Sequence, residues 1–494
     1  MPINCYLVNI KKIVILSLIN GLLFSLPFLV DKLFFIVFFS TAFLFYNQER
    51  ILKIWHKVIY LTICACLWQF ITLGWFYSDS SVEFWNVSLV ILLSITVLLL
   101  LLLTFFLIIK PYIARWNFFL FAVLWIGYEL FWTTWEIRYP MMSFGIILGN
   151  TPSLIQWYSV TGVMGGSLWI MLINFVVLRL LKKQPVHFWH AIVLAPSIVS
   201  LWMLFEKTNE NGINTVSVNC KLDDEKNITE QIMQLLENGI DKSTDLIVCP
   251  EGMLNLPTSS FPVNSYFSRI KRLLLSKAPR ATIIYGCKME ESISSPLKKH
   301  NVYNLAVQCD TSGFIRYRNK RILVPFGECI PYEKYLGGIS AIKAAVPEVI
   351  TFNYDHDQLF FVYNRFNVLP LICYELYFSN EIRKYYKEGS IGVISCLSND
   401  YAIPNDLYYT QFMRMAKIQA LTFKTPIVKS TIHGRSHIID SKGRTLSSDY
   451  NSTELTKGKI AINPKQTIYA KYGHLSIFIL LLMFIPFFIK INDK

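Results

Sequence analysis

Long apolar runs separated by short polar connections fill the first 205 residues, and one further run lies near the C-terminal end. A helix needs roughly 17 to 25 mostly apolar residues to cross about 30 Å of hydrocarbon. The first run is followed by Asp31, Lys32 and more apolar sequence instead of a small-residue cleavage site, so we expect a retained helix. The pattern predicts about eight membrane spans, the second being the shortest, near residues 12–30, 33–47, 57–77, 84–109, 115–133, 160–181, 188–205 and 473–489.

Residues 206–472 have a different pattern, in which short β-rich runs and helical segments alternate between polar turns. Examples are "NTVSVNC", "DLIVCPE", "RATIIYGC" and "IGVISCLSND". A segment of about 260 residues is long enough to bury a core of its own. We therefore expect an N-terminal transmembrane domain of about seven helices over 1–205, an α/β domain over 206–472 and a C-terminal transmembrane helix over 473–494.

Composition and charge place these parts relative to a membrane. The chain is 53% hydrophobic and only 16% charged, which is typical of a protein whose solvent is partly lipid. Lys and Arg concentrate in the connections on one side, about twelve against two, and the richer side is normally cytoplasmic. Both termini are then cytoplasmic and the α/β domain is external. Much of the net charge of +14 follows from this topology, so no nucleic-acid partner is needed to explain it.

The ten cysteines give no sign of a metal site, because none lies in a CxxC pair or in a Cys/His pattern with metal-ligand spacing. We expect neither a metal nor another cofactor. Many of the cysteines in the α/β domain lie inside or at the ends of apolar runs, as core cysteines do, and disulfides are left open. Cys373 ends the apolar run "NVLPLIC", which fits either a core strand with a buried thiol or a strand that delivers a nucleophile.

Three ionisable side chains follow apolar runs in the α/β domain. Glu251 ends "STDLIVCPE", Lys320 follows "GFIRYRN" and Cys373 ends the run above. Functional groups in α/β domains tend to lie at the carboxyl ends of strands. A thiol needs a base to become a nucleophile, and a tetrahedral intermediate needs positive charge at its oxyanion, so this set suits acyl transfer. Taken singly, a glutamate or a lysine after a strand is more often a solvated turn residue.

The local sequence around all three strengthens the catalytic interpretation. The stretches "CPEG", "RNKRILVPFGECIPYE", "LICYE" and "LSND", in this order, resemble the nitrilase superfamily, and with the membrane spans the chain resembles the apolipoprotein N-acyltransferases over nearly its full length. The resemblance implies an external nitrilase-like αββα sandwich and assigns Glu251 as general base, Lys320 as oxyanion-stabilising cation and Cys373 as nucleophile. Glu328, in "LVPFGE", is implied to orient the lysine and the nucleophile.

The resemblance also implies the substrates. The acyl donor would be a membrane phospholipid, phosphatidylethanolamine by the family pattern, and the acceptor would be the α-amine of the N-terminal diacylglyceryl-cysteine of a lipoprotein. Cys373 would carry the acyl chain as a thioester between the two steps. The implied setting is a bacterial inner membrane with the catalytic domain in the periplasm, and nothing in the sequence demands more than a monomer.

The sequence departs from the family pattern at three places. After Asp400 it continues "YAIPND" where relatives usually have Ala-Trp-Phe, so the expected pocket aromatic is missing or is supplied by Tyr401. His433, in "IHG", stands where relatives often have paired Asn, and is either a surface turn residue or a pocket residue of this protein. Pro257 also lies further from Glu251 than usual.

Two other functions remain open. In a membrane-anchored amidase or hydrolase, water would resolve the thioester, and the first half-reaction would be the same. A non-catalytic lipoprotein-binding relative is less consistent with the joint presence of Glu251, Lys320 and Cys373. The apolar connection "IRYPMMSFGIILGNTPSLIQWYS" likewise has two interpretations, a lipid-facing rim or a packed interface.

Overall fold

The computed structural model divides the chain into two compact units, which we describe separately. The first comprises Met1–Tyr77, Phe84–Leu204 and Tyr472–Lys494, and the second comprises Ser78–Glu83 and Phe205–Lys471. The predicted span 473–489 lies largely outside the described residues. The structure describes residues 9–112, 117–206, 212–221, 228–261, 264–290, 301–313, 315–339, 348–349, 358–363, 366–450, 452–462, 465–478 and 481.

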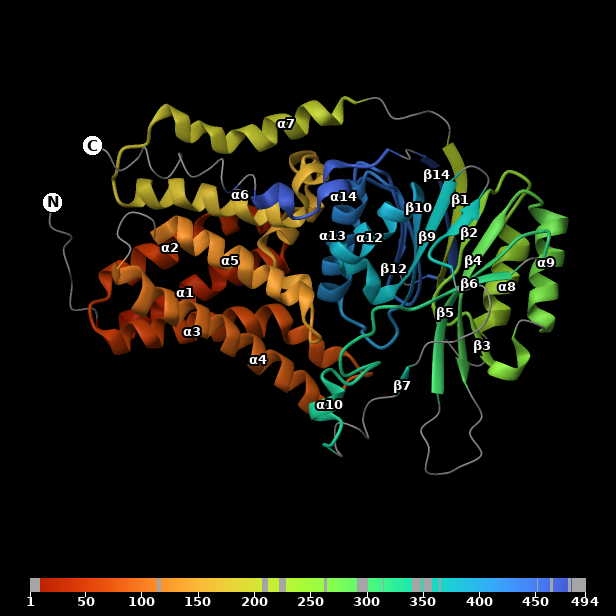
Figure 1. Ribbon diagram of the computed structural model, residues 1–494, viewed down its shortest axis with the longest axis horizontal. Coiled ribbons are helices and arrows are strands. Elements are labelled where there is room, and N and C mark those ends of the chain that lie inside the picture. Colours follow the sequence, from red (N-terminus) through yellow and green to blue (C-terminus); the bar gives the residue numbers. More distant parts are fainter. Residues whose placement is uncertain are drawn as a thin grey trace. The chain divides into compact units, whose positions relative to one another are not determined.

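The first unit is helical. Its helices are α1 (Ile10–Leu29), α2 (Val37–Arg50), α3 (Ile54–Leu73), α4 (Phe84–Leu103), α5 (Asn117–Thr134), α6 (Tyr158–Leu181) and α7 (Ala195–Leu204) (Figure 1). In the described part of the chain, four helical stretches are long and apolar enough to cross a membrane, namely Ile10–Leu29, Ile54–Ser78, Phe84–Tyr112 and Tyr158–Leu181. The expectation of an apolar helical domain is confirmed, and the count of about eight spans stays a prediction.

The apolar connection between α5 and α6 is folded into the first unit. Its 3₁₀ segments η5 (Pro140–Met142) and η6 (Phe144–Asn150) are largely buried. Glu129 of α5 anchors them, because its carboxylate accepts hydrogen bonds from the Ser143 hydroxyl at 2.9 Å and the Phe144 backbone N–H at 2.9 Å. Irregular backbone away from water needs such partners, so this buried carboxylate explains how a non-helical segment is accommodated.

The second unit is built on one continuous set of paired strands. In order of pairing the main path is β6-β5-β4-β2-β1-β11-β10-β9-β8, and β14 pairs with β1 while β12 pairs with β11 and β13. The strands are β1 (Gly212–Cys220), β2 (Leu246–Val248), β3 (Leu254–Pro257), β4 (Thr282–Glu290), β5 (Asn301–Cys309), β6 (Ile315–Asn319), β7 (Glu348–Val349), β8 (Phe361–Tyr363), β9 (Phe366–Ile372), β10 (Ile391–Asn399), β11 (Ile427–Ile432), β12 (Arg435–Ile439), β13 (Thr445–Tyr450) and β14 (Glu454–Ala461).

The two halves of this continuous sheet pack face to face as the two sheets of a sandwich. The β6-to-β1 half meets the β11-to-β8 half in the pairing path only through a short parallel contact, Asn219 with Thr431 and Cys220 with Ile432. Side chains alternate across each strand. In β2, Leu246 and Val248 pack into the core shared by both sheets, while Ile247 points to the opposite face. The same inward core receives residues from β9, β10 and β11 of the other half.

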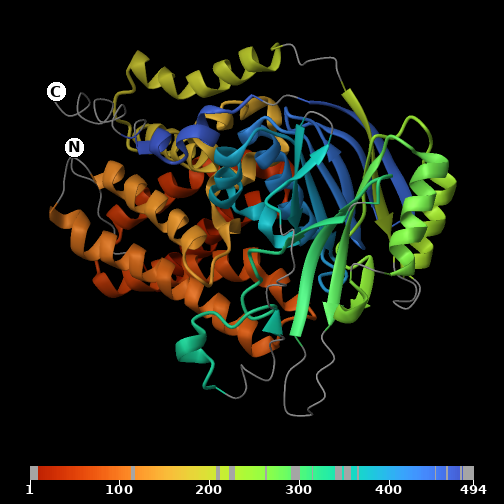
Figure 2. The ribbon, with the colours of Figure 1, turned by 45° about the vertical axis from the view of Figure 1, so that its right-hand side comes forward.

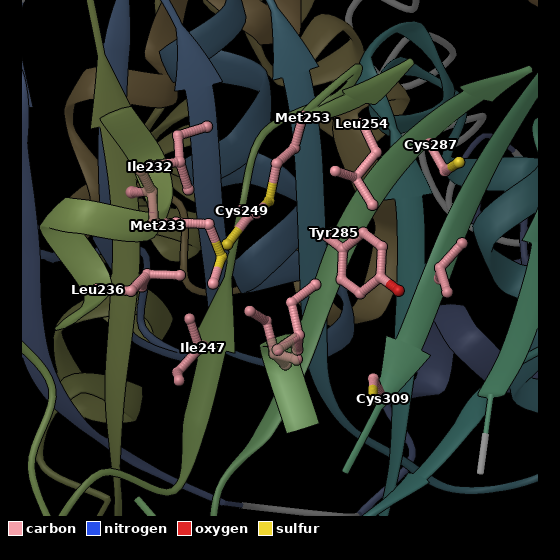
Figure 3. Packing of buried hydrophobic residues seen from close by; sticks show 14 of the residues in the cluster. Ile232, Met233, Leu236, Ile247, Cys249, Met253, Leu254, Tyr285, Cys287 and Cys309 are labelled. Carbon is pink, nitrogen blue, oxygen red and sulfur yellow. The ribbon is translucent and has the colours of Figure 1, made fainter. Parts of the chain in front are cut away.

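Helices cover the outer faces. Figure 1 and Figure 2 show α8 (Ile228–Gly239) and α9 (Ser265–Lys277) against one sheet and α12 (Ser379–Glu388) and α13 (Asp406–Phe423) against the other. Figure 3 shows the apolar face of α8, with Ile232, Met233 and Leu236, packed against Ile247 and neighbouring strand residues. The layers therefore run helix, sheet, sheet, helix, which confirms the αββα sandwich. The chain also contains the short helices α10 (Glu333–Leu336) and α14 (Ile468–Tyr472).

Candidate active site

The three strand ends singled out in the sequence bring their side chains together, with Glu251 and Lys320 buried and Cys373 partly buried. Glu251 lies three residues after β2, Lys320 follows β6 directly and Cys373 follows β9 directly. The Lys320 Nζ lies 3.4 Å from Glu251 Oε1 and 2.6 Å from Glu328 Oε1. The ammonium group therefore contacts both carboxylates. Lys320 also interacts electrostatically with Cys373, so it links all four predicted site residues.

Backbone contacts hold Glu251 at the turn after β2. Its N–H donates to the Ser398 carbonyl at 3.3 Å, and its Oε1 accepts from the Asn304 amide Nδ2 at 2.6 Å. The turn runs closely along β4, where Gly286 N–H donates to the Pro250 carbonyl at 3.0 Å. A Cβ on Gly286 would lie 2.5 Å from the Glu251 Cα, so glycine is needed for this close approach.

A tight loop positions Glu328. The Val324 N–H donates to Glu328 Oε2 at 2.9 Å, while the Glu328 N–H donates to the Val324 carbonyl at 2.8 Å. Phe326 within the loop has a φ of 62°, in the left-handed region that β-carbon-bearing residues rarely adopt. One carboxylate oxygen of Glu328 therefore closes its own loop and the other is free to bind the Lys320 ammonium.

Cys373 lies at a sharp turn between a strand and a helical segment. Strand β9 ends at Ile372, Cys373 itself has a φ of 48°, and the 3₁₀ segment η11 (Cys373–Tyr377) begins at this residue. The Ser398 hydroxyl, from the end of β10, lies 3.5 Å from Cys373 Sγ. A residue on such a turn projects its side chain beyond the sheet, which is the backbone arrangement that nucleophile elbows use.

Electrostatic interactions within the cluster shift the pKa values of its members in different directions. Burial by itself raises the pKa of Glu251, but the cations Lys320 and Lys288 outweigh it and hold that pKa below the ordinary glutamate value. Burial lowers the pKa of Lys320, and the carboxylates of Glu251 and Glu328 reverse this, so its pKa lies above the ordinary lysine value. Burial raises the pKa of Cys373 to about 12, with Glu251 adding to the rise and Lys320 opposing it. Cys373 therefore rests as a thiol beside an ionised carboxylate that can accept its proton.

Two buried ion pairs beside the cluster were not anticipated from the sequence. Arg318 pairs with Glu375, with Nη1 to Oε2 at 2.7 Å, and Lys429 pairs with Asp400, with Nζ to Oδ2 at 2.7 Å. Glu375 and Asp400 stand within the motifs "LICYE" and "LSND", but the motifs carry no information about their partners. Each pair spans at least 29 residues of chain, so only the folded arrangement reveals it.

Two of the three segments that depart from the family pattern, those of Tyr401 and His433, lie close together. The Tyr401 and His433 rings approach with their centroids 5.0 Å apart, and the His433 N–H donates to the Cys220 carbonyl at 2.8 Å. The Ala402 carbonyl accepts from the Ser80 N–H at 2.8 Å, within the second unit. His433 is therefore in contact with the residue that follows Asp400.

The buried Glu251 carboxylate, the buried Lys320 ammonium and the partly buried Cys373 thiol together have the chemical functions needed for nucleophilic attack on a carbonyl carbon. The carboxylate can take the thiol proton, and the ammonium can stabilise negative charge on the carbonyl oxygen.

Comparison with known proteins gives similarities in both parts of the chain. The profile of the apolipoprotein N-acyltransferase N-terminal domain matches residues 20–176. The apolipoprotein N-acyltransferase of Haemophilus influenzae is 26% identical over 392 residues, covering 74% of this chain and 73% of its own length. That of Wigglesworthia glossinidia brevipalpis is 25% identical over 461 residues, covering 86% of each chain.

Among solved structures, Saccharomyces cerevisiae Nit3, a member of the nitrilase superfamily, aligns with a TM-score of 0.36 at 13% identity, covering 52% of this chain and 92% of Nit3. The carbon-nitrogen hydrolase from Helicobacter pylori G27 aligns with a TM-score of 0.35 at 14% identity, covering 57% of this chain and 99% of the hydrolase.

Proposed function

We propose that this chain, which is a homologue of the apolipoprotein N-acyltransferases, moves an acyl chain from a membrane phospholipid to the α-amine of the N-terminal diacylglyceryl-cysteine of lipoproteins. Cys373 is the nucleophile, Glu251 the general base, Lys320 the oxyanion-stabilising cation and Glu328 the residue that orients Lys320. The observation that carries the proposal is the buried cluster in which the Lys320 ammonium contacts Glu251 while both influence the charge on Cys373.

The first half-reaction forms a thioester. Glu251 takes the proton from the Cys373 thiol, and the sulfur attacks the ester carbonyl of the phospholipid. Negative charge develops on the carbonyl oxygen, where the Lys320 ammonium stabilises it. When the intermediate collapses, the ester C–O bond breaks and Glu251 returns the proton to the departing oxygen, which releases a lysophospholipid.

The second half-reaction forms the amide. The neutral α-amine of the lipoprotein cysteine attacks the thioester carbonyl, Glu251 accepts the proton that the amine loses, and the carbon–sulfur bond breaks to regenerate Cys373. A thioester is activated towards amines, so an ester is converted to an amide without nucleotide or metal. Phosphatidylethanolamine is the donor that we propose, and a monomer is sufficient for this ping-pong scheme.

The apolar helices fit this chemistry, because both substrates are anchored in a bilayer. We propose a bacterial inner membrane with both termini cytoplasmic and the catalytic domain in the periplasm, on the basis of the Lys and Arg distribution in the connections. Domain boundaries at about residues 205 and 472 belong to the same proposal.

The test is intact-protein mass spectrometry after incubation with phosphatidylethanolamine, with and without neutral hydroxylamine. We expect an acyl adduct that hydroxylamine removes in the wild type and in Cys396→Ala, but no adduct in Cys373→Ala. Cys396 is a matched control because it is a buried cysteine on β10, in register with Leu371 of β9.

A diacylglyceryl-modified lipopeptide should then discharge the adduct and become N-acylated. Absence of any adduct on folded wild-type protein would overturn the proposal. Discharge by water alone, with lipopeptide left unmodified, would overturn the transferase and favour a hydrolase.

A further inference from the structure

The Ser398 hydroxyl lies between two acceptors that compete for its one hydrogen. Its Oγ is 3.5 Å from Cys373 Sγ and 2.5 Å from Asp400 Oδ1. Ser398 is fully buried near the end of β10, so water does not compete for the hydroxyl. A serine hydroxyl donates one hydrogen and accepts through its lone pairs. It can therefore donate either to the carboxylate or to the sulfur, but not to both at once.

Asp400 is held in place independently of Ser398. Its Oδ2 binds the Lys429 ammonium at 2.7 Å, and its Oδ1 accepts from the Tyr408 hydroxyl at 3.0 Å. Lys429 in turn donates to the Arg435 carbonyl at 3.1 Å. Each carboxylate oxygen of Asp400 keeps a donor when the Ser398 hydroxyl turns away, so the turn leaves no buried acceptor unpaired.

We propose that Ser398 is a switchable hydrogen-bond donor to the sulfur of Cys373, and that Asp400 and Lys429 are positioning residues for it. The role rests on the proposed function of Cys373 as nucleophile. In the resting thiol, the S–H donates to Ser398 Oγ, whose own hydrogen goes to Asp400. When Glu251 removes the thiol proton, the Ser398 hydroxyl rotates and donates to the thiolate. No proton leaves Ser398, so charge and atoms balance.

The same rotation serves each half-reaction. The thioester sulfur is uncharged and a weak acceptor, so the hydroxyl returns to Asp400 while the acyl chain is bound. The thiolate reappears when the amine displaces it, and Ser398 again supplies a hydrogen bond to the leaving sulfur. A hydrogen bond to the charged form favours that form, so Ser398 assists the two moments at which sulfur carries charge.

The surrounding charges explain why such a donor is useful. Cys373 is subject to negative charge from Glu251 and Asp400, and Lys320 provides the opposing positive charge. The Ser398 hydroxyl carries no net charge, so it can stabilise the thiolate without forming an ion pair with Glu251. It therefore does not compete with Lys320 for the Glu251 carboxylate. The titratable groups around the sulfur come from several elements and are Glu251, Lys320, Asp400, Tyr377, Cys396 and Tyr408.

The test measures alkylation of Cys373 by iodoacetamide against pH, in detergent and without lipid, by peptide mass spectrometry. Only the thiolate reacts, so the profile reports thiolate formation. Replacing Ser398 by Ala removes the hydrogen bond to a charged acceptor, and we expect about tenfold slower alkylation at each pH on the rising part of the profile. The corresponding shift of the alkylation profile is about one pH unit towards higher pH.

The matched control is Ser395→Ala. Ser395 lies on the same strand, is equally buried, and has no hydrogen-bond partner for its hydroxyl within the described part of the chain. We expect its profile to coincide with that of the wild type. Three buried cysteines of the second unit, Cys220, Cys249 and Cys396, report on folding and should remain unmodified in both variants.

A Ser398→Ala profile identical to the wild type would overturn the proposal, as would equal displacements in Ser398→Ala and Ser395→Ala. The measurement uses no acyl donor. If the wild type forms no thioester, the proposed function is contradicted. The alkylation profiles still test the role of Ser398 in that case.

Discussion

Arg318 and Glu375 form a fully buried, two-point ion pair that ties the strand before Lys320 to the turn that carries Cys373. The guanidinium Nη1 lies 2.7 Å from Oε2 and Nη2 lies 3.0 Å from Oε1, with side-chain exposures of 0% and 1%. The same carboxylate accepts from the backbone N–H of Ile372 at 2.7 Å and of Arg321 at 2.8 Å. These two residues directly precede the thiol and directly follow the ammonium, so one carboxylate sets the spacing of two of the proposed active-site groups.

Replacing Glu375 by Gln should therefore damage both stability and chemistry. The variant leaves the Arg318 charge buried without its counter-ion, and breaking such a pair typically costs about 3–5 kcal/mol of unfolding free energy. Thermal unfolding and the rate of thioester formation would both be measured. Glu237→Gln is the control, since its ion pair with Arg269 is solvent-exposed and should contribute less than about 1 kcal/mol. Equal stability of the two variants would contradict this role for Glu375.

A methyl group at Gly286 should displace Glu251, the proposed general base. The added Cβ would lie 2.5 Å from the Glu251 Cα and 2.6 Å from the Gly252 N, and backbone atoms cannot move aside as a flexible side chain can. We expect Gly286→Ala to lose about 1–3 kcal/mol of unfolding free energy. It should also lose most of the burst, which is the thioester adduct formed in the first turnover. Gly338→Ala, where the new Cβ has no atom within 4 Å, should behave as the wild type. A full burst in Gly286→Ala would show that the turn tolerates the change.

The acid side of the pH profile should respond to Lys288. This cation lowers the pKa of Glu251, next after Lys320 among the charges. In the proposed mechanism thioester formation requires the Glu251 carboxylate, so we expect activity to be lost as pH falls through that pKa. Removing the positive charge in Lys288→Met raises the pKa, and the loss should begin at a higher pH than in the wild type. Lys288→Arg keeps the charge and should keep the wild-type profile. Initial rates of adduct formation against pH decide the matter, and coincident acid limbs for the Met variant and the wild type would exclude this influence.

Lys320 and Glu328 should differ in the size of their effects. Lys320→Met removes the charge that we propose stabilises the oxyanion, and we expect a decrease of roughly 10²–10³ in the rate of thioester formation. Glu328→Gln removes one of the two carboxylates that contact the ammonium, but the 3.4 Å contact with Glu251 remains, so its effect should be smaller. Single-turnover measurements with saturating phospholipid compare the two. The reverse order would indicate that Glu328, not Lys320, acts on the reacting atoms.

Some features followed from the sequence because they depend only on neighbouring residues. The runs at 12–30 and 160–181 correspond to α1 and α6, since the free energy of transferring a helix into lipid is a sum over consecutive side chains. The αββα sandwich was expected from the resemblance, and the two-faced packing of β2 agrees with it. The run at 33–47 corresponds to a 3₁₀ segment, η1 (Asp31–Ile36), followed by the 14-residue α-helix α2. The hydropathy of the run does not show where the 3₁₀ geometry gives way to the α-helix.

The sequence also located the residues at strand ends, because an apolar run that stops at a polar residue is a local signal. Glu251, Lys320 and Cys373 were found in this way, and their catalytic roles stay predictions. Their convergence was decided by the packing of the two halves of the sheet against each other, since β6 and β9 lie near opposite ends of the pairing path.

Only the tertiary structure decided which buried polar groups lie against each other. Arg318 selects Glu375 across 57 residues, and Ser398 lies against both Cys373 and Asp400. Hydropathy and spacing record whether a residue is polar, but the energy of a buried charge depends on which group lies within about 3 Å of it. That proximity follows from strand register and from the packing of the two halves of the sheet against each other, and not from the neighbouring sequence.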